Sequence, residues 1–165
     1  MPAPLGRLTP RAWLGLTAVT CVAALAAALV SQHVFEMQPC PWCVLQRLVF
    51  VLVGLVALAG ALTPRPAFWR ASAALSGLFA LAGVATALWH HFVATSSVSC
   101  ELTLADRLMS ATGLDMALPQ VFAAFASCAD AKARLLGVPY EFWSLGLYAL
   151  LAAVAALVWR QAARR

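Results

Sequence analysis

Charged side chains are scarce in this chain of 165 residues: Asp, Glu, Lys and Arg together make up 10% of it, whereas 64% is hydrophobic. A soluble domain covers its surface with charges of both signs, so this composition excludes an ordinary soluble protein. Several long stretches lack all four charged residue types. The shortage of charge therefore predicts a membrane protein.

Four uncharged stretches come close to the roughly 20 residues that an α-helix needs to cross about 30 Å of hydrocarbon. We expect an all-α, four-helix membrane bundle that forms one domain over residues 1–165, with spans at about 12–32, 44–62, 71–92 and 142–159. The first stretch could also be a signal peptide, but it is longer than the usual apolar core of one, so we expect it to be retained.

All acidic residues lie on one predicted side of the membrane, and most basic residues lie on the other. Acidic residues fall only in the two predicted outer loops, at about 33–43 and 93–141, while the other membrane-flanking sites carry Arg7, Arg11, Arg65, Arg70, Arg160, Arg164 and Arg165. This positive-inside pattern predicts that both termini are cytoplasmic. It also excludes a nucleic-acid-binding patch, which would need the basic residues on one folded surface.

The long second outer loop predicts short helices on the membrane surface. Thr103 can cap one of them, with Asp106 three residues later, and Leu104, Leu108 and Met109 would share its apolar face. A second apolar run at 116–125 has helical spacing but is too short to span the membrane.

The chain has only five cysteines, and most of them are on one side. Cys40, Cys43, Cys100 and Cys128 lie on the predicted outer side, whereas Cys21 lies near the middle of the first span. An even number of cysteines in a compartment that tolerates disulfides predicts two disulfide bonds. Cys21 is small and apolar, and we expect it to be a packing residue.

Cys40 and Cys43 form a C-x-x-C motif, which redox pairs share with zinc sites and c-type haem attachment sites. Haem attachment needs a histidine directly after the second cysteine, where this chain has Val44. A zinc site is disfavoured because Cys100 and Cys128 are far apart and no outer-side histidine has ligand spacing to either. We therefore expect redox chemistry and no bound metal.

Arg47 lies one helical turn after Cys43, at the expected depth of the membrane interface. A cation there can stabilise a thiolate and hydrogen-bond a carbonyl oxygen of a lipid-soluble oxidant, or it can be an interfacial anchor. His90 and His91 end the third span on the same side. A histidine at that boundary can anchor the helix or donate a proton to a quinone.

Several motifs carry a resemblance to a known family. They are PCPWCVLQR at 39–47 before an apolar helix, PQVF at 119–122, SCA at 127–129 and LLG at 135–137 before the last span. The chain closely resembles the disulfide bond formation protein B (DsbB) family of bacterial inner-membrane oxidases, and the resemblance covers nearly its whole length. Gln46 stands where some members carry Glu.

The resemblance implies a protein-disulfide oxidoreductase whose active cysteines are periplasmic. A periplasmic, DsbA-like thioredoxin-fold oxidase would be reoxidised by a Cys100–Cys128 disulfide, and the electrons would pass to Cys40–Cys43. Ubiquinone or menaquinone would then accept them and deliver them to the respiratory chain. For the quinone site the resemblance implies Arg47 and a histidine, for which we choose His91.

Two other functions remain open on the sequence alone. A vitamin K epoxide reductase-like protein also pairs loop cysteines with a C-x-x-C beside a quinone, but in that family the loop pair comes first. A non-enzymatic scaffold could use the two disulfides merely to staple its outer loops. Structural disulfides resist mild reductants, whereas a redox pair is reduced and reoxidised readily.

Overall fold

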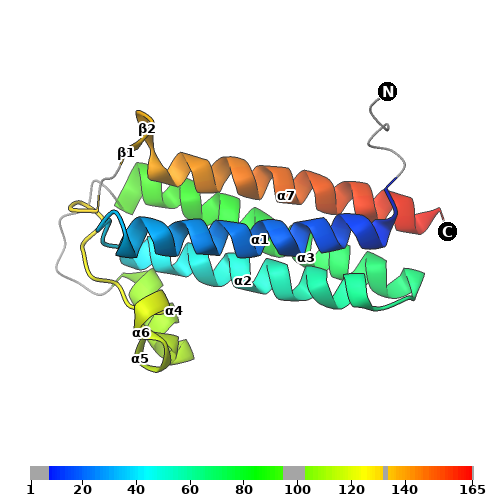
Figure 1. Cartoon of the computed structure of the whole chain (residues 1–165), viewed down its shortest axis with the longest axis horizontal. Helices are drawn as coiled ribbons and strands as arrows, with labels where there is room; N and C mark the ends of the chain where they lie inside the picture. The colour runs from blue at the N-terminus through cyan, green and yellow to red at the C-terminus, as the bar shows by residue number, and fades with distance from the viewer. Residues whose placement is uncertain (1–7, 95–102, 132–133, 165) are drawn as a thin grey trace.

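Four long helices lie side by side and form the body of the molecule in this computed structural model, which describes residues 8–94, 103–131 and 134–164 (Figure 1). They are α1 (Pro10–His33), α2 (Pro41–Leu62), α3 (Pro66–Trp89) and α7 (Tyr140–Ala163). All four are long and apolar enough to cross a membrane, with α3 continuing to Ala94. The predicted all-α, four-helix membrane bundle is confirmed.

Proline sets the beginning of every span. Pro10, Pro41 and Pro66 occupy the first turns of α1, α2 and α3, and Pro139 immediately precedes α7. Proline suits this place because its fixed φ is already helical and its missing N–H would have had no partner within the helix. The helix α2 begins at Pro41 and not near Val44 as the sequence predicts. Its first turn therefore already includes the second cysteine of the motif, Cys43.

The spans pack in the order α1, α2, α3, α7, with α2 against α1 and α3, and α7 against α3. Small residues permit the closest approaches: a Cβ on Gly83 would lie 2.5 Å from the ring of Tyr148. The fully buried Tyr148 stacks on Phe50 and donates a hydrogen bond of 2.6 Å to the Gln46 carbonyl. These contacts fix α7 against the segment of α2 that carries the C-x-x-C motif.

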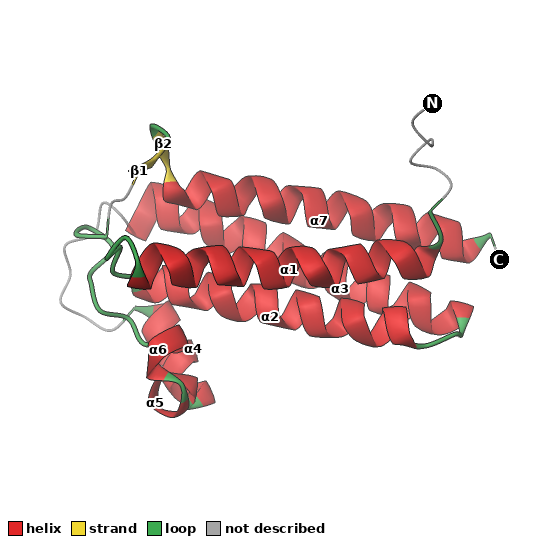
Figure 2. Ribbon diagram, in the orientation of Figure 1, coloured by secondary structure: helices red, strands yellow, loops and turns green. Residues whose placement is uncertain are grey.

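The long connection between α3 and α7 begins with one π-helical turn, His90–Ala94, and contains three short helices. They are α4 (Leu104–Thr112), α5 (Leu114–Ala117) and α6 (Pro119–Phe122), and all lie at one end of the bundle (Figure 1). A two-stranded hairpin, β1 (Arg134–Leu135) and β2 (Val138–Pro139), leads directly into α7 (Figure 2). We call this end of the bundle the cysteine end.

The structure partly changes the expected loop helices. Thr103 and Asp106 form the predicted capping box. The predicted shared apolar face is wrong, because Met109 is buried with Ala105 while Leu104 and Leu108 are exposed. Packing against α2 selects the alanine and methionine side of α4, and the two leucines face outward.

The apolar run at 116–125 is not one helix. Pro119 cannot continue a helix from the preceding residues, so the chain turns at Leu118 and restarts as α6. Phe125 lies beyond α6, where its backbone N–H bonds to the Pro39 carbonyl. The break brings the loop back to the residue that precedes the C-x-x-C motif.

Candidate redox site

Three sulfur atoms gather at the cysteine end. Cys40 is the N-cap of α2, and its Sγ lies 2.8 Å from the Sγ of Cys43 in the first turn. Cys128, from the loop after α6, packs in the same buried cluster as Cys40 and interacts with it electrostatically. The cysteines that the structure describes, Cys21 included, are free thiols. Cys40, which is fully buried, is therefore the sulfur shared by the motif and the loop.

The loop is held in place by its backbone. The N–H groups of Phe125 and Ala126 both donate to the Pro39 carbonyl, at 2.9 and 3.3 Å. Ser127 and Asp130 then close a local turn, with the Ser127 hydroxyl donating to the Asp130 carboxylate over 2.5 Å. Cys128 lies inside this turn and is buried. Its position beside Cys40 thus depends on backbone contacts made immediately before each cysteine.

The pKa values of Cys40 and Cys128 shift in opposite directions, because the interaction between them stabilises the thiol form of Cys40 and the thiolate form of Cys128. This interaction, together with the one with Cys43 and burial, raises the pKa of Cys40. The same Cys40 interaction, assisted by His90, lowers the pKa of Cys128 from 9.0 to about 5. Cys128 is therefore the thiolate of the pair at neutral pH, and a thiolate is both the nucleophile and the better leaving group in disulfide exchange.

The adjacent histidines point in different directions, since successive residues on a helical turn are roughly 100° apart. His90 is buried, and its Nε2 lies 3.3 Å from the Sγ of Cys40. His91 instead places its Nδ1 2.8 Å from Glu141 Oε1 and packs on Phe142. Of the cysteines that the structure describes, Cys40 is thus contacted by His90.

Arg47 is a buried cation, with 6% of its surface exposed. Its Nη1 donates to Gln32 Oε1 over 2.6 Å and to the Val121 carbonyl over 2.8 Å, and its Nη2 donates to the Ala28 carbonyl over 3.3 Å. No acidic side chain pairs with Arg47 within the described part of the chain. Neutral oxygens satisfy its donors but leave its charge uncompensated, so Arg47 attracts any anion that forms nearby.

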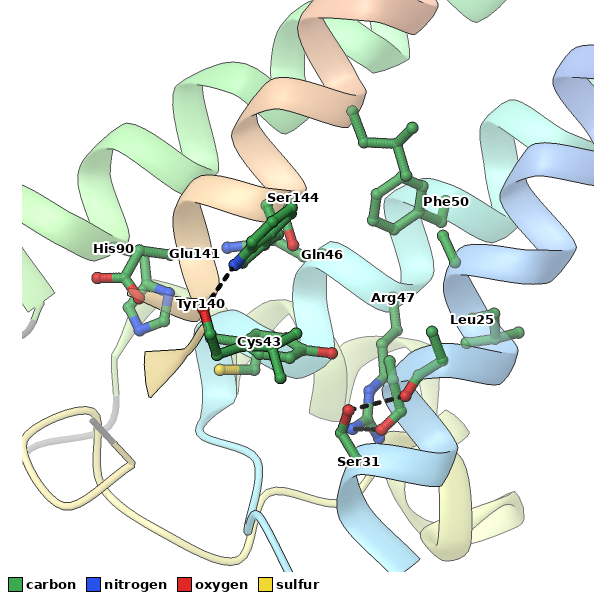
Figure 3. A pocket seen from close by; sticks show the side chains of 16 residues that line it. Leu25, Ser31, Cys43, Gln46, Arg47, Phe50, His90, Tyr140, Glu141 and Ser144 are labelled. Atoms are coloured by element: carbon green, nitrogen blue, oxygen red, sulfur yellow. Dashed lines mark hydrogen bonds between the residues drawn. The ribbon is translucent and has the colours of Figure 1, made fainter. Parts of the chain in front are cut away.

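A cavity of about 250 Å³ lies beside this cluster, between α1, α2 and α7 (Figure 3). Cys43, Gln46 and Arg47 line it from α2, together with His90, while most of the remaining lining is apolar. The Gln46 side chain is 4% exposed. Its Nε2 and the Nδ1 of His90 are buried without a hydrogen-bond partner among the described residues. The Gln46 amide is therefore available as a donor to a molecule in the cavity, and so is His90 Nδ1 in the tautomer that carries its proton there.

The fold and the site together define a class: a multi-pass membrane protein with a buried cluster of thiols at one end of its bundle. Comparison with known proteins makes this more specific. The family model "Disulfide bond formation protein DsbB" matches residues 10–158, which is most of the chain. The chain belongs to this family.

Individual relatives agree with the family match. Disulfide bond formation protein B of Verminephrobacter eiseniae is 36% identical over 148 residues, covering 87% of this chain and 82% of the relative. The Ralstonia nicotianae protein of the same name is 35% identical over 144 residues, covering 86% and 89%. Disulfide bond formation protein B 1 of Pseudomonas aeruginosa is 34% identical over 141 residues, covering 83% and 86%. The chain is accordingly a membrane disulfide bond formation protein with a redox role.

Most of the residues selected from sequence meet at this site. Cys40, Cys43 and Cys128 form the cluster, and Arg47 shares the cavity with Cys43. Cys100 lies outside the described residues. The placement of His91 at a quinone stays a prediction, and His91 is not among the residues that line the cavity.

Sequence reasoning missed two functional candidates: Gln32, which accepts a hydrogen bond from Arg47, and Gln46, which lines the cavity. A signal for both was present, because each is a polar residue inside an otherwise apolar helix. Polar groups within a membrane span are costly and mark functional sites.

Proposed function

We propose that this protein is a quinone-dependent oxidase that restores the disulfide of a periplasmic, DsbA-like thioredoxin-fold partner. The observation that carries the proposal is the contact of Cys40 with both Cys43 and Cys128, directly beside a largely apolar cavity with unpaired donors. The contact with Cys128 links the motif to the loop, and the cavity links the motif to an apolar oxidant.

Electrons enter through the loop. A thiolate of the partner attacks Cys100 of a Cys100–Cys128 disulfide, and Cys128 leaves as a thiolate because its pKa is low. Cys128 then attacks Cys40 of a Cys40–Cys43 disulfide, which releases Cys43 as a thiolate. The partner's second thiol completes its own disulfide by displacing Cys100. Cys100 displaces Cys40 from Cys128, and this restores the loop disulfide and leaves Cys40 and Cys43 as a dithiol.

The cavity fits a quinone on the evidence of its own residues. The apolar lining suits a ring, and the orphaned Gln46 Nε2 and His90 Nδ1 can donate hydrogen bonds to ring oxygens. A quinone bound there supplies the two-electron oxidation that returns Cys40 and Cys43 to a disulfide. Arg47 stabilises negative charge as it develops beside Cys43, and His90 holds or transfers a proton at Nε2 next to Cys40.

The proposal is tested with the purified full-length chain in detergent, a reduced thioredoxin-fold dithiol partner and a soluble ubiquinone analogue, without oxygen. We expect one quinone to be reduced for each partner disulfide formed, as measured by quinone absorbance and by thiol titration. Partner thiols that persist while the quinone stays oxidised would contradict the proposal. Replacing ubiquinone with a menaquinone analogue then shows which quinone the protein prefers.

The proposed orientation places the cysteine end in the periplasm and both termini in the cytoplasm. Its support is the distribution of arginines: Arg11 lies in the first turn of α1, Arg65 caps the start of α3 and Arg160 lies in the last turn of α7. Figure 1 shows these three helix ends at one end of the bundle and the start of α2, which Cys40 caps, at the other. A reporter that is active only in the periplasm, fused after Arg165, is expected to be silent. An active fusion would reverse the orientation.

A further inference from the structure

The reduced thiol cluster is also a set of possible metal ligands. The sulfurs of Cys40 and Cys43 and a ring nitrogen of His90 all lie within 4.8 Å of one another. Neutral imidazole and thiolate are the preferred ligands of zinc and similar soft divalent ions. The spacing of the cysteines and histidines in the sequence disfavours zinc, but His90, at the end of α3, is brought to the cluster by the fold.

The distances suit a single ion. With Zn–S bonds of about 2.3 Å and Zn–N bonds of about 2.0 Å, ligand atoms around a tetrahedral zinc lie about 3.5–3.8 Å apart. Cys40 Sγ is 2.8 Å from Cys43 Sγ and 3.3 Å from His90 Nε2. Binding therefore requires the cysteine side chains to rotate so that the two sulfurs separate by about 1 Å more. Cys128 interacts with both Cys40 and His90, but its sulfur lies outside the group of atoms within 4.8 Å of one another, so it has to move toward the cluster to supply the fourth ligand.

We propose that the reduced protein binds one zinc-like divalent ion through Cys40, Cys43, His90 and Cys128. No electron moves on binding: the ion gains metal–sulfur and metal–nitrogen bonds, and thiol protons are released to solvent. Oxidation of Cys40 and Cys43 to a disulfide removes two of the ligands, so the site exists only in the reduced state. A bound ion occupies the sulfurs that reoxidation needs, and it therefore inhibits turnover.

Burial makes the site selective. Cys40 is fully buried and His90 nearly so, against the apolar side chains of Trp42, Ala94 and Met109. Such surroundings favour an ion that exchanges all its water for protein ligands, as zinc and cadmium do in closed four-ligand sites. Magnesium and calcium, which require oxygen ligands, are excluded by the donor set.

Cadmium serves as the probe, because cadmium–thiolate bonds absorb in the near ultraviolet. The full-length protein in detergent, reduced and kept anaerobic, is titrated with Cd²⁺, and Zn²⁺ is then added as a competitor. We expect one equivalent to bind to the reduced protein and none to the oxidised protein. Equal binding by the oxidised protein, or no saturable binding by the reduced protein, would overturn the proposal.

Matched histidine variants identify the ligand. His90→Ala is expected to weaken Cd²⁺ binding at least tenfold, whereas His91→Ala leaves it unchanged, because His90 contacts Cys40. Equal affinities would remove His90 from the site. A Cys100→Ser protein should retain the site, and loss of binding there would show that Cys100 is a ligand in place of Cys128.

Alkylation of the wild-type protein gives a test that does not depend on the folding of any variant. One equivalent of Zn²⁺ is expected to slow the modification of Cys40, Cys43 and Cys128 together at least tenfold, as read by mass spectrometry. Unchanged alkylation of Cys40 and Cys43 in the presence of Zn²⁺ would refute the site.

Discussion

The two ends of the bundle are built from the same kinds of helices but differ in whether an arginine charge is buried. At the turn end, where residues 63–65 join α2 to α3, Trp69 Nε1 donates to the Thr63 carbonyl over 2.7 Å. Arg11, which is exposed, donates to the Ala61 carbonyl over 3.0 Å. At the cysteine end, Arg47 is buried without an acidic partner among the described residues. Both arginines bond to backbone oxygens, but only one keeps its charge away from water.

The cysteine end therefore keeps a buried charge, Arg47, which lowers the stability of the fold. Burying the Arg47 cation costs free energy, and among the described residues this cost is confined to the cysteine end. Buried polar atoms without a hydrogen-bond partner occur at both ends: Gln46 Nε2 and His90 Nδ1 at the cysteine end, and Trp13 Nε1 and Gln161 Oε1 at the turn end. The turn end, by contrast, is closed by tight contacts, as between Gly60 and Ser72. The account therefore predicts that changes at the cysteine end alter chemistry, whereas changes at the turn end alter stability.

The largest expected effect is that of Cys43→Ser. Cys43 lines the cavity, so its loss should reduce quinone reduction to the background rate in the coupled assay with the dithiol partner. Cys21→Ser is the matched control, since Cys21 is buried among apolar side chains in the middle of the bundle. Substantial turnover in Cys43→Ser, or a comparable loss in Cys21→Ser, would contradict the distinction between a reactive Cys43 and a packing Cys21.

Arg47→Met comes next. Removing a charge-assisted hydrogen bond costs about 1.5–3 kcal/mol, so the quinone concentration for half-maximal turnover should rise by about one to two decades. Exchange between the partner and the loop cysteines should continue. Arg11→Met, at the turn end, should leave the quinone dependence unaltered. If both variants behave alike, Arg47 is an interfacial anchor and the cavity is not the quinone site.

The pH dependence of Cys128 alkylation tests the different acidities of Cys128 and Cys40 at the cysteine end. Because the pKa of Cys128 is lowered to about 5, its thiolate form persists from neutral pH down to that value. Alkylation of Cys128 in the reduced protein, followed by mass spectrometry, should therefore be half-maximal near pH 5. In Cys40→Ala the midpoint should move up toward the ordinary value of 9.0, because the stabilising interaction is lost. A wild-type midpoint near 9 would contradict the assigned roles.

Gly60→Ala should have the smallest effect on chemistry. Its new Cβ would lie 2.7 Å from the Ser72 Cβ and 2.9 Å from Leu14 Cδ1, so the helices must shift. We expect a loss of about 1–3 kcal/mol in stability, measured as a lower unfolding temperature. Quinone dependence should not change in protein that remains folded. A change in quinone affinity with no loss of stability would show that the two ends are coupled.

The sequence allowed the spans, the charge asymmetry and the redox motif to be predicted, because each depends on residues close together in the chain. Hydrophobic length defines a span, and Cys40 and Cys43 are one helical turn apart. The contacts that complete the site could not be predicted in the same way. Cys128 reaches Cys40 through backbone hydrogen bonds to Pro39, and Arg47 meets Gln32 from another helix.

The choice between His90 and His91 shows most clearly what could not be predicted from the sequence. Both His90 and His91 end the third span, and the sequence does not indicate at what angle a helix leaves its last turn. The π-helical turn that begins at His90 determines this angle, directing His90 to Cys40 and His91 to Glu141. Such turns are frequent at functional sites but have no strong sequence signature.

The central claim is that Cys40 is shared between the motif and the loop, and disulfide mapping of a Cys43→Ala, Cys100→Ser protein tests it most directly. With the motif partner of Cys40 and the loop partner of Cys128 both removed, Cys40 should pair with Cys128, which packs beside it in the same buried cluster. Mild oxidation of the reduced variant, proteolysis and mass spectrometry should therefore reveal a Cys40–Cys128 crosslink. Free Cys40 and Cys128 thiols after the same oxidation would contradict the account.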